Sequence, residues 1–185
     1  WAAVTGSGYA AIRTVGDYDF TADIPVFTNR LWLAHTGSGK LTFSGALAPT
    51  RGISYSNAGG LPTTFGGAAN PQRLFNSLEV PSGTVEVASG SLFAAAGSGS
   101  SFRVGSSNDL ASATLLVSGG SVDAAVKPNS ANAQTAKFYL ADTGAKPAVL
   151  RIEEGAGFTN NLLSACNAGE KSAIQQFGGD VFSLG

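Results

Sequence analysis

The residues able to do acid–base or thiol chemistry are few in this chain. Its only histidine, His35, follows Leu31-Trp32-Leu33-Ala34 and precedes a Gly-Ser-Gly corner. A general base needs an orienting carboxylate and a nucleophile beside it, and the sequence identifies neither. His35 is therefore predicted to be a solvated or corner-capping side chain. The only cysteine, Cys166, is predicted to be a small buried apolar residue. We expect no catalytic residue and no cofactor.

Carboxylates are the next candidates, as metal ligands or as a hydrolytic pair. Asp17, Asp19 and Asp23 alternate with apolar residues, but the glycine and the distal glutamate of an EF-hand are missing, so a solvated turn is predicted and no metal site. Glu153 and Glu154 are adjacent, and on a strand they point to opposite faces, which is unsuitable for a glycosidase pair. The charged residues near the later repeats form no recognisable motif and are predicted to be solvated: Arg103, Asp109, Asp123, Lys137 and Asp142.

Aromatic side chains give the stronger indication of a binding surface. Trp32, Tyr55, Phe65 and Tyr139 are candidate platforms for sugar stacking or protein docking. The alternative is that Trp32 and Phe65 are core residues or loop anchors.

Composition limits the function classes further. The chain has 185 residues, 43% hydrophobic and only 12% charged, with 25 glycines and no methionine, which suits a secreted or surface β protein. A net charge of −1 with scattered lysines and arginines gives no basic stripe for nucleic acid. No stretch approaches the roughly 18 apolar residues of a membrane helix, so no membrane insertion is expected. Because the chain starts at Trp1, we expect a processed mature product or a fragment of a larger polypeptide.

Short segments with period-two alternation predict an all-β domain. The predicted strands are residues 31–33, 41–43, 77–80, 84–87, 91–93, 102–104, 114–117, 121–122, 138–140, 149–152 and 181–184. Five pairs of residues recur at an offset of roughly 35 residues, as stacked repeats require: Phe102 with Phe138, Val104 with Leu140, Leu115 with Leu150, Val117 with Ile152, and Gly120 with Gly155. The fold class predicted is a right-handed parallel β-helix (β-solenoid), with a β-sandwich or jelly roll as the alternative.

Other segments depart from this pattern. Residues 1–185 are predicted to form one domain, with 1–30 an N-terminal irregular or capping segment and 53–72 a long loop rich in Gly, Asn, Pro and Thr. Residues 159–166 are predicted to form one or two helical turns capped by Thr159 or Asn160, and 168–176 has weak helical potential.

One segment resembles a known family. Residues 37–47, Gly-Ser-Gly-Lys-Leu-Thr-Phe-Ser-Gly-Ala-Leu, resemble the autotransporter-associated β-strand repeat, which has the form Gly-x-Gly-x-Leu-Thr-hydrophobic-x-Gly. Residues 115–122 are similar to the segments that follow it in such proteins. The resemblance covers residues 31–158 loosely and implies a bacterial surface or extracellular protein with a right-handed β-helix.

The C-terminal segment predicts how the chain associates. Val181-Phe182-Ser183-Leu184 is apolar and offers no polar cap for an open solenoid end. We therefore expect self-association into a homo-oligomer, filament, sheath or layer, or contact with neighbouring repeats of a longer chain, and a glycan is a further possible partner. The function predicted is a non-enzymatic structural or adhesive surface module, and the alternative is a β-helical protein that binds or degrades polysaccharide.

Overall fold

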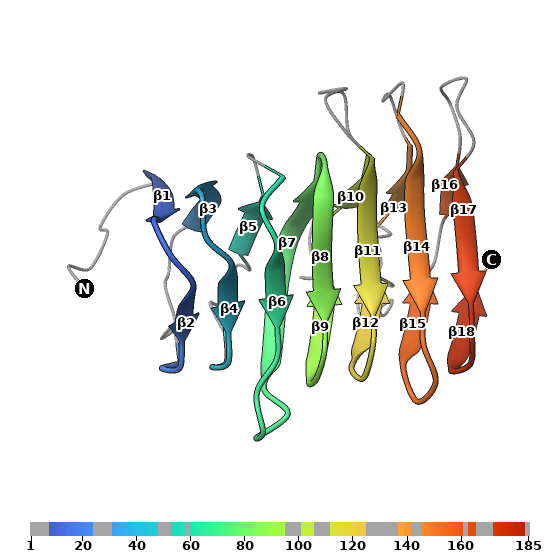
Figure 1. The fold of residues 1–185 in the computed structure, drawn as a ribbon. Coiled ribbons are helices and arrows are strands. Elements are labelled where there is room, and N and C mark those ends of the chain that lie inside the picture. The colour runs from blue at the N-terminus through green and yellow to red at the C-terminus, as the bar shows by residue number, and fades with distance from the viewer. Residues whose placement is uncertain are drawn as a thin grey trace, which may run out of the picture.

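The computed structural model is built from β-strands and contains no helix in the part of the chain that it describes (Figure 1). Described are residues 8–23, 31–47, 53–57, 60–94, 101–105, 112–124, 137–141, 146–160, 163–165 and 172–183. The strands are β1 (Gly8–Thr14), β2 (Tyr18–Phe20), β3 (Leu31–Gly37), β4 (Leu41–Phe43), β5 (Ile53–Ser56), β6 (Thr63–Phe65), β7 (Gln72–Val80), β8 (Gly83–Val87), β9 (Ser91–Ala94), β10 (Ser101–Val104), β11 (Ala113–Val117), β12 (Ser121–Ala124), β13 (Lys137–Leu140), β14 (Ala148–Ile152), β15 (Gly157–Asn160), β16 (Leu163–Ala165), β17 (Ala173–Gln176) and β18 (Asp180–Ser183). The all-β prediction is confirmed.

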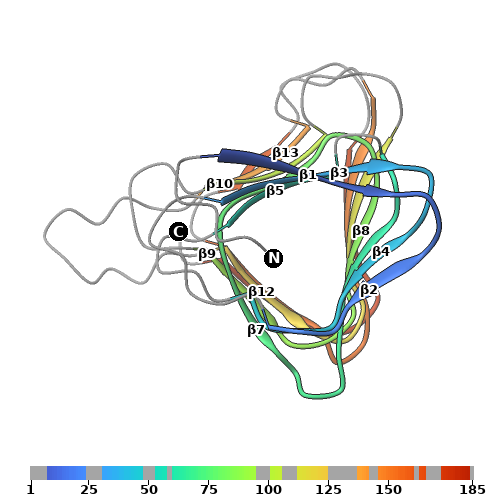
Figure 2. The ribbon, with the colours of Figure 1, turned by 90° about the vertical axis from the view of Figure 1, so that its left-hand side faces the viewer.

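The strands form three walls of parallel sheet around a common interior (Figure 2). Wall 1 contains β1, β3, β5, the second half of β7, β10, β13 and β16. Wall 2 contains β2, β4, β6, β8, β11, β14 and β17. Wall 3 contains the first half of β7, β9, β12, β15 and β18, because residues 72–75 pair with β9 whereas residues 77–80 pair with β10. All strand pairs among the described residues are parallel, unlike those of an antiparallel sandwich or jelly roll.

Strands consecutive in sequence lie in different walls, and each set of two or three such strands forms a layer that we call a rung. Tyr18 pairs with Leu41, 23 residues on, and Leu41 pairs with Thr63, 22 residues on. The interval rises to 35 residues between Leu115 and Leu150. The predicted repeat of roughly 35 residues is therefore correct for the later rungs and too long for the first ones.

The predicted alignment of the later rungs is confirmed at four of its five pairs. Phe102 pairs with Phe138 and Val104 with Leu140, while Leu115 pairs with Leu150 and Val117 with Ile152. The glycine pair is wrong, because Gly120 O accepts a hydrogen bond from Gly157 N at 3.0 Å, two residues beyond Gly155.

Alternation along each strand separates the core from the outer surface. In β11 the first, third and fifth residues are buried and the second and fourth are partly exposed, as the pleat requires. Stacking the rungs aligns the inward residues into rows along the interior. Phe20, Phe43 and Phe65 form one such row, with ring centroids 5.4 and 5.3 Å apart and planes inclined by 15°. The rungs are therefore held together by both main-chain pairing and the packing of like side chains.

Glycine allows the close approach of rungs at the corner before β8. Gly83 has a φ of +71°, and a Cβ there would lie 1.9 Å from Gly60 O of the preceding rung. A side chain at this position is excluded both by the backbone conformation and by space.

Three predictions about local structure are wrong. The described part of residues 1–30 is not irregular, because β1 and β2 pair in parallel with β3 and β4. Residues 53–72 are not a long loop, because they contribute β5, β6 and the first residue of β7. The described residues of 159–166 and 168–176 are not helical but end β15 and form β16 and β17, because pairing with the previous rung outweighs local helix propensity.

Candidate functional site

The four aromatic residues predicted as a contact surface do not come together. Tyr55 and Phe65 are 2% and 0% exposed, and their rings pack edge to face with centroids 5.5 Å apart. The prediction that these two side chains form an exposed platform is therefore wrong, and for Phe65 the alternative of a core residue is confirmed. Tyr139 lies on the outer face of wall 1, with the Arg103 guanidinium 4.9 Å from its ring centroid. The Trp32 side chain lies outside the described residues.

His35 is fully buried, so the prediction of a solvated or corner-capping side chain is wrong. Its Nε2 lies 3.0 Å from Thr14 Oγ1, and its Nδ1 lies 3.2 Å from Thr63 Oγ1. Tyr55 Oη lies 2.6 Å from the same Thr63 oxygen. The residue faces inward because it continues the alternation of β3, in which Leu33 is also buried.

The hydrogen bonds of this buried cluster define the tautomer of His35. Thr14 Oγ1 donates its only proton to Gly39 O at 3.1 Å, so Thr14 must accept from Nε2–H. Nδ1 then has no proton and accepts from Thr63, which in turn accepts from Tyr55. Burial lowers the pKa of His35 from its usual 6.5 and raises that of Tyr55. The cluster is a neutral chain of hydrogen bonds without a carboxylate, and its members come from rungs 1 to 3.

Arg73 is a second buried polar group that the sequence analysis missed. It is 0% exposed and stands in an inward row of wall 3, paired with Leu92 of β9. Nη2 donates to Phe43 O at 2.9 Å and to Gly66 O, and Nη1 donates to Ser89 O at 3.1 Å. These three carbonyls end the wall 2 strands of three successive rungs. Burial lowers the Arg73 pKa to about 10, so the guanidinium is charged at neutral pH.

The aspartates of the first rung bind the main chain and a side chain of the next rung. Asp17 Oδ1 accepts from Lys40 N at 2.9 Å, and Asp23 Oδ1 accepts from Ala46 N at 2.7 Å. Asp19 accepts from the Ser44 hydroxyl at 2.8 Å. Thus the predicted solvated turn is exposed, but its carboxylates connect two rungs. No group of three or more histidine, cysteine, aspartate or glutamate side chains is placed to hold a metal ion in the described part of the chain.

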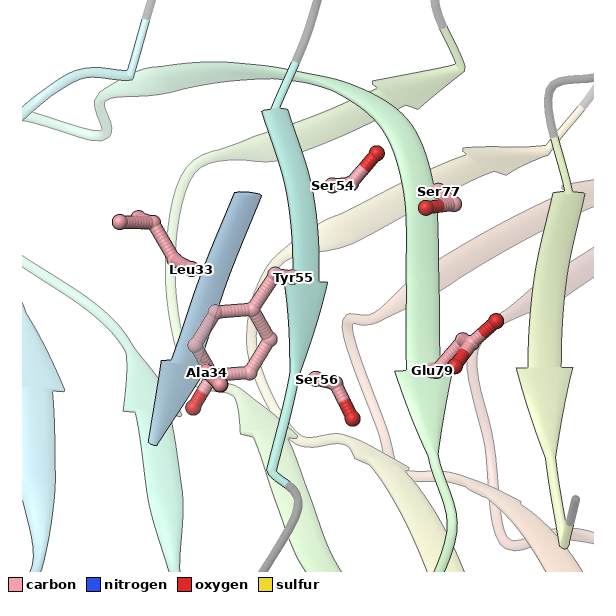
Figure 3. Close-up of a pocket in the computed structure, with 7 residues that line it drawn as sticks. All are labelled: Leu33, Ala34, Ser54, Tyr55, Ser56, Ser77 and Glu79. Atoms are coloured by element: carbon pink, nitrogen blue, oxygen red, sulfur yellow. The ribbon is translucent and has the colours of Figure 1, made fainter. Parts of the chain in front are cut away.

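A shallow depression of about 190 Å³ lies on the outer side of wall 1, across β3, β5 and β7 (Figure 3). Its seven lining residues are Leu33, Ala34, Ser54, Tyr55, Ser56, Ser77 and Glu79. Glu79 is the only charged residue among them, and the side chains of Ser54 and Ser77 are themselves buried. The depression has a carboxylate but lacks the convergent set of polar groups that a specific ligand pocket carries.

Comparison with known proteins identifies no relative. Neither a family model, nor a curated protein, nor a solved structure matches this chain. The resemblance of residues 37–47 to the autotransporter-associated β-strand repeat remains a prediction from the residues. No helix among the described residues is long and apolar enough to cross a membrane.

The two buried polar sites had a detectable sequence signal. His35 lies two residues after Leu33, and Arg73 lies two residues before Phe75, so both occupy the inward phase of an alternating segment. A polar residue in that phase predicts a buried polar group. What the sequence could not supply was the partners, because Thr14, Thr63 and the carbonyl of Phe43 are all far away along the chain.

Proposed function

We propose that this chain is a right-handed parallel β-helix and acts as a non-enzymatic structural or adhesive module at an extracellular or bacterial cell surface. The three parallel walls support the β-helix, since each strand returns to its own sheet after crossing the other two. Connections between parallel strands of one sheet are right-handed in about 98% of cases, which supports the handedness. The low charged fraction and the resemblance of residues 37–47 support the location.

The observation that carries this function is the use made of the polar side chains. The His35 cluster joins rungs 1 to 3, and Arg73 binds carbonyls of three rungs. The carboxylates of Asp17, Asp19 and Asp23 bind the rung that follows them. Groups that could serve acid–base or metal chemistry are thus committed to holding the layers together. A protein whose polar groups maintain an elongated stack is suited to supplying length and surface.

A shape measurement combined with a sugar panel tests this function. Small-angle scattering of the purified chain is expected to give the profile of a rod. Incubation with acidic and neutral polysaccharides is expected to release no reducing ends, with Asp123→Asn as a comparison variant on the outer face. Depolymerisation by the wild-type protein that is lost in such a variant would overturn the proposal and support the polysaccharide-degrading alternative. Tight binding of one soluble sugar by a compact monomer would also overturn it.

A further inference from the structure

The first and last rungs present unpaired strand edges. In wall 2, β2 and β17 are the two terminal strands of the sheet, and each is paired on one side only. The other sheet ends in the same way at β1 and β18. An unpaired edge carries a row of N–H and C=O groups that can pair with another strand. Both ends of this stack are therefore able to accept a further parallel strand.

Inward-facing apolar residues are exposed at both of these ends. Ile174 of β17 pairs with Leu150, which is 1% exposed, yet Ile174 itself is 45% exposed. Tyr18 of β2 pairs with fully buried Leu41 and is 55% exposed. Each residue continues a row that is buried everywhere between them, and each lacks the neighbour on its outer side. The same holds for Val181 of β18, which pairs with buried Phe158 and is 38% exposed.

Tyr18 and Ile174 belong to one and the same row of wall 2. The row runs through the paired residues Tyr18, Leu41, Thr63, Val85, Leu115, Leu150 and Ile174. A second copy of the chain moved along the stacking direction would therefore place its Tyr18 over Ile174 of the first copy. The adjacent outward positions would place Asp19 beside Gln175, whose amide can donate to a carboxylate. The neighbouring inward row ends in Gln176, which donates to Gly179 O at 2.9 Å, so the apolar contact in this wall centres on Ile174.

We propose that the partner of each open end is the opposite end of a second copy, so that β17 of one molecule pairs in parallel with β2 of the next. This inference rests on the proposed structural function and specifies its assembly. Head-to-tail stacking keeps every strand pair parallel, as in all the described pairs, whereas joining two like ends by a two-fold axis would make the new pairs antiparallel. A head-to-tail contact does not close on itself, and it therefore produces a linear filament.

Variants that block one end each provide the test. Tyr18→Lys places a charge on the β2 edge and Ile174→Lys places one on the β17 edge. Because both positions are about half exposed, the folded monomer should tolerate the lysine, which circular dichroism and thermal unfolding will verify. The matched controls are Val15→Lys, which is exposed near the first edge, and Gln175→Lys, which is on the outward face of β17.

Sedimentation velocity over a hundredfold range of concentration gives the readout. The wild-type chain and both controls are expected to form species that lengthen with concentration, and each end-blocked variant alone is expected to stay monomeric. An equimolar mixture of the two end-blocked variants has one free head and one free tail, so it is expected to form a dimer of twice the monomer mass and nothing larger.

Two results would overturn the inference without touching the proposed function. Dimers of Tyr18→Lys alone would show that like ends associate, and a wild-type chain that stays monomeric throughout would show that a second copy is not the partner. The proposed function itself fails on a different measurement, namely sugar release or tight sugar binding by the chain.

Discussion

Replacing the buried Arg73 by methionine tests whether the interior of the stack depends on main-chain carbonyls being bound by one side chain. Methionine has a similar length and fills the space, but it donates no hydrogen bond. The bonds lost are those to Phe43 O, Gly66 O and Ser89 O. Phe43 O keeps a second donor, Gly66 N at 3.0 Å, so its loss matters least.

The expected cost follows from the two other carbonyls and from the aromatic contact. A buried acceptor without a partner costs about 1–3 kcal/mol; this applies to Gly66 O, whereas Ser89 lies in a partly exposed corner where water can replace the donor. The guanidinium also lies 5.7 Å from the Phe65 ring centroid, a contact worth roughly 0.5–2 kcal/mol. Removing a desolvated charge offsets part of this loss. We therefore expect a net destabilisation of about 2–4 kcal/mol, and a fall in Tm of about 5–15 °C.

Urea unfolding followed by circular dichroism measures this free energy, and a second arginine gives the control. Arg151 is on the outside, with its side chain 45% exposed and an ion pair to Glu153 at 2.6 Å, so Arg151→Met should cost no more than about 1 kcal/mol. Arg73→Lys keeps the charge but lacks the fork of donors, and it should fall between the wild type and Arg73→Met. If Arg73→Met and Arg151→Met prove equal within about 0.5 kcal/mol, the carbonyl contacts of Arg73 do not stabilise the stack, and the reasoning is refuted.

Three further substitutions test the buried groups of the early rungs. Because burial lowers the pKa of His35 below 6.5, the unfolded chain binds the proton first; the stability contributed by His35 should be complete above pH 6.5 and decline as pH falls below it, and His35→Gln should flatten urea midpoints measured between pH 7.5 and 5. Phe43→Ala should lower the free energy of unfolding by about 3–5 kcal/mol, since both stacked neighbours lose a partner, and half-exposed Tyr18→Ala should cost far less in the same urea assay. Gly83→Ala should cost about 1–3 kcal/mol by thermal unfolding, because its φ of +71° is strained for alanine, and an unchanged Tm would contradict the close approach to Gly60.

The sequence predicted those parts of the fold in which apolar alternation is regular. Each of the eleven predicted segments falls within a strand over its described residues. The outward positions of Glu79, Arg103 and Tyr139 are also as expected, since each is partly exposed between buried neighbours. This success has a physical reason: in the later rungs the inward rows are filled by aliphatic and aromatic residues, so local pattern and long-range pairing give the same answer.

Prediction failed where polar residues occupy the inward rows. Thr63 stands between Leu41 and Val85 in its row, and the Thr-Thr-Phe sequence of β6 therefore gives no alternation of apolar and polar residues. In the same part of the chain His35 and Arg73 are turned inward. Each of these polar groups is satisfied by partners from other rungs, and such partners cannot be inferred from neighbours in sequence. The candidate site went wrong for the same reason, because Tyr55 and Phe65 looked like aromatic residues of a surface loop.

The spacing of the rungs explains why the repeat was found late in the chain and missed early. The interval between paired residues changes from 22 residues for Leu41 and Thr63 to 35 for Leu115 and Leu150, yet β8, β11 and β14 are all five residues long. The added residues thus lie between strands and leave the paired segments unchanged. Because pairing depends only on the strands, the stack accepts connections of different length without losing its inward rows. A search for one fixed period sees only those rungs whose connections match, whereas the inward rows run from Tyr18 to Ile174 regardless of the interval.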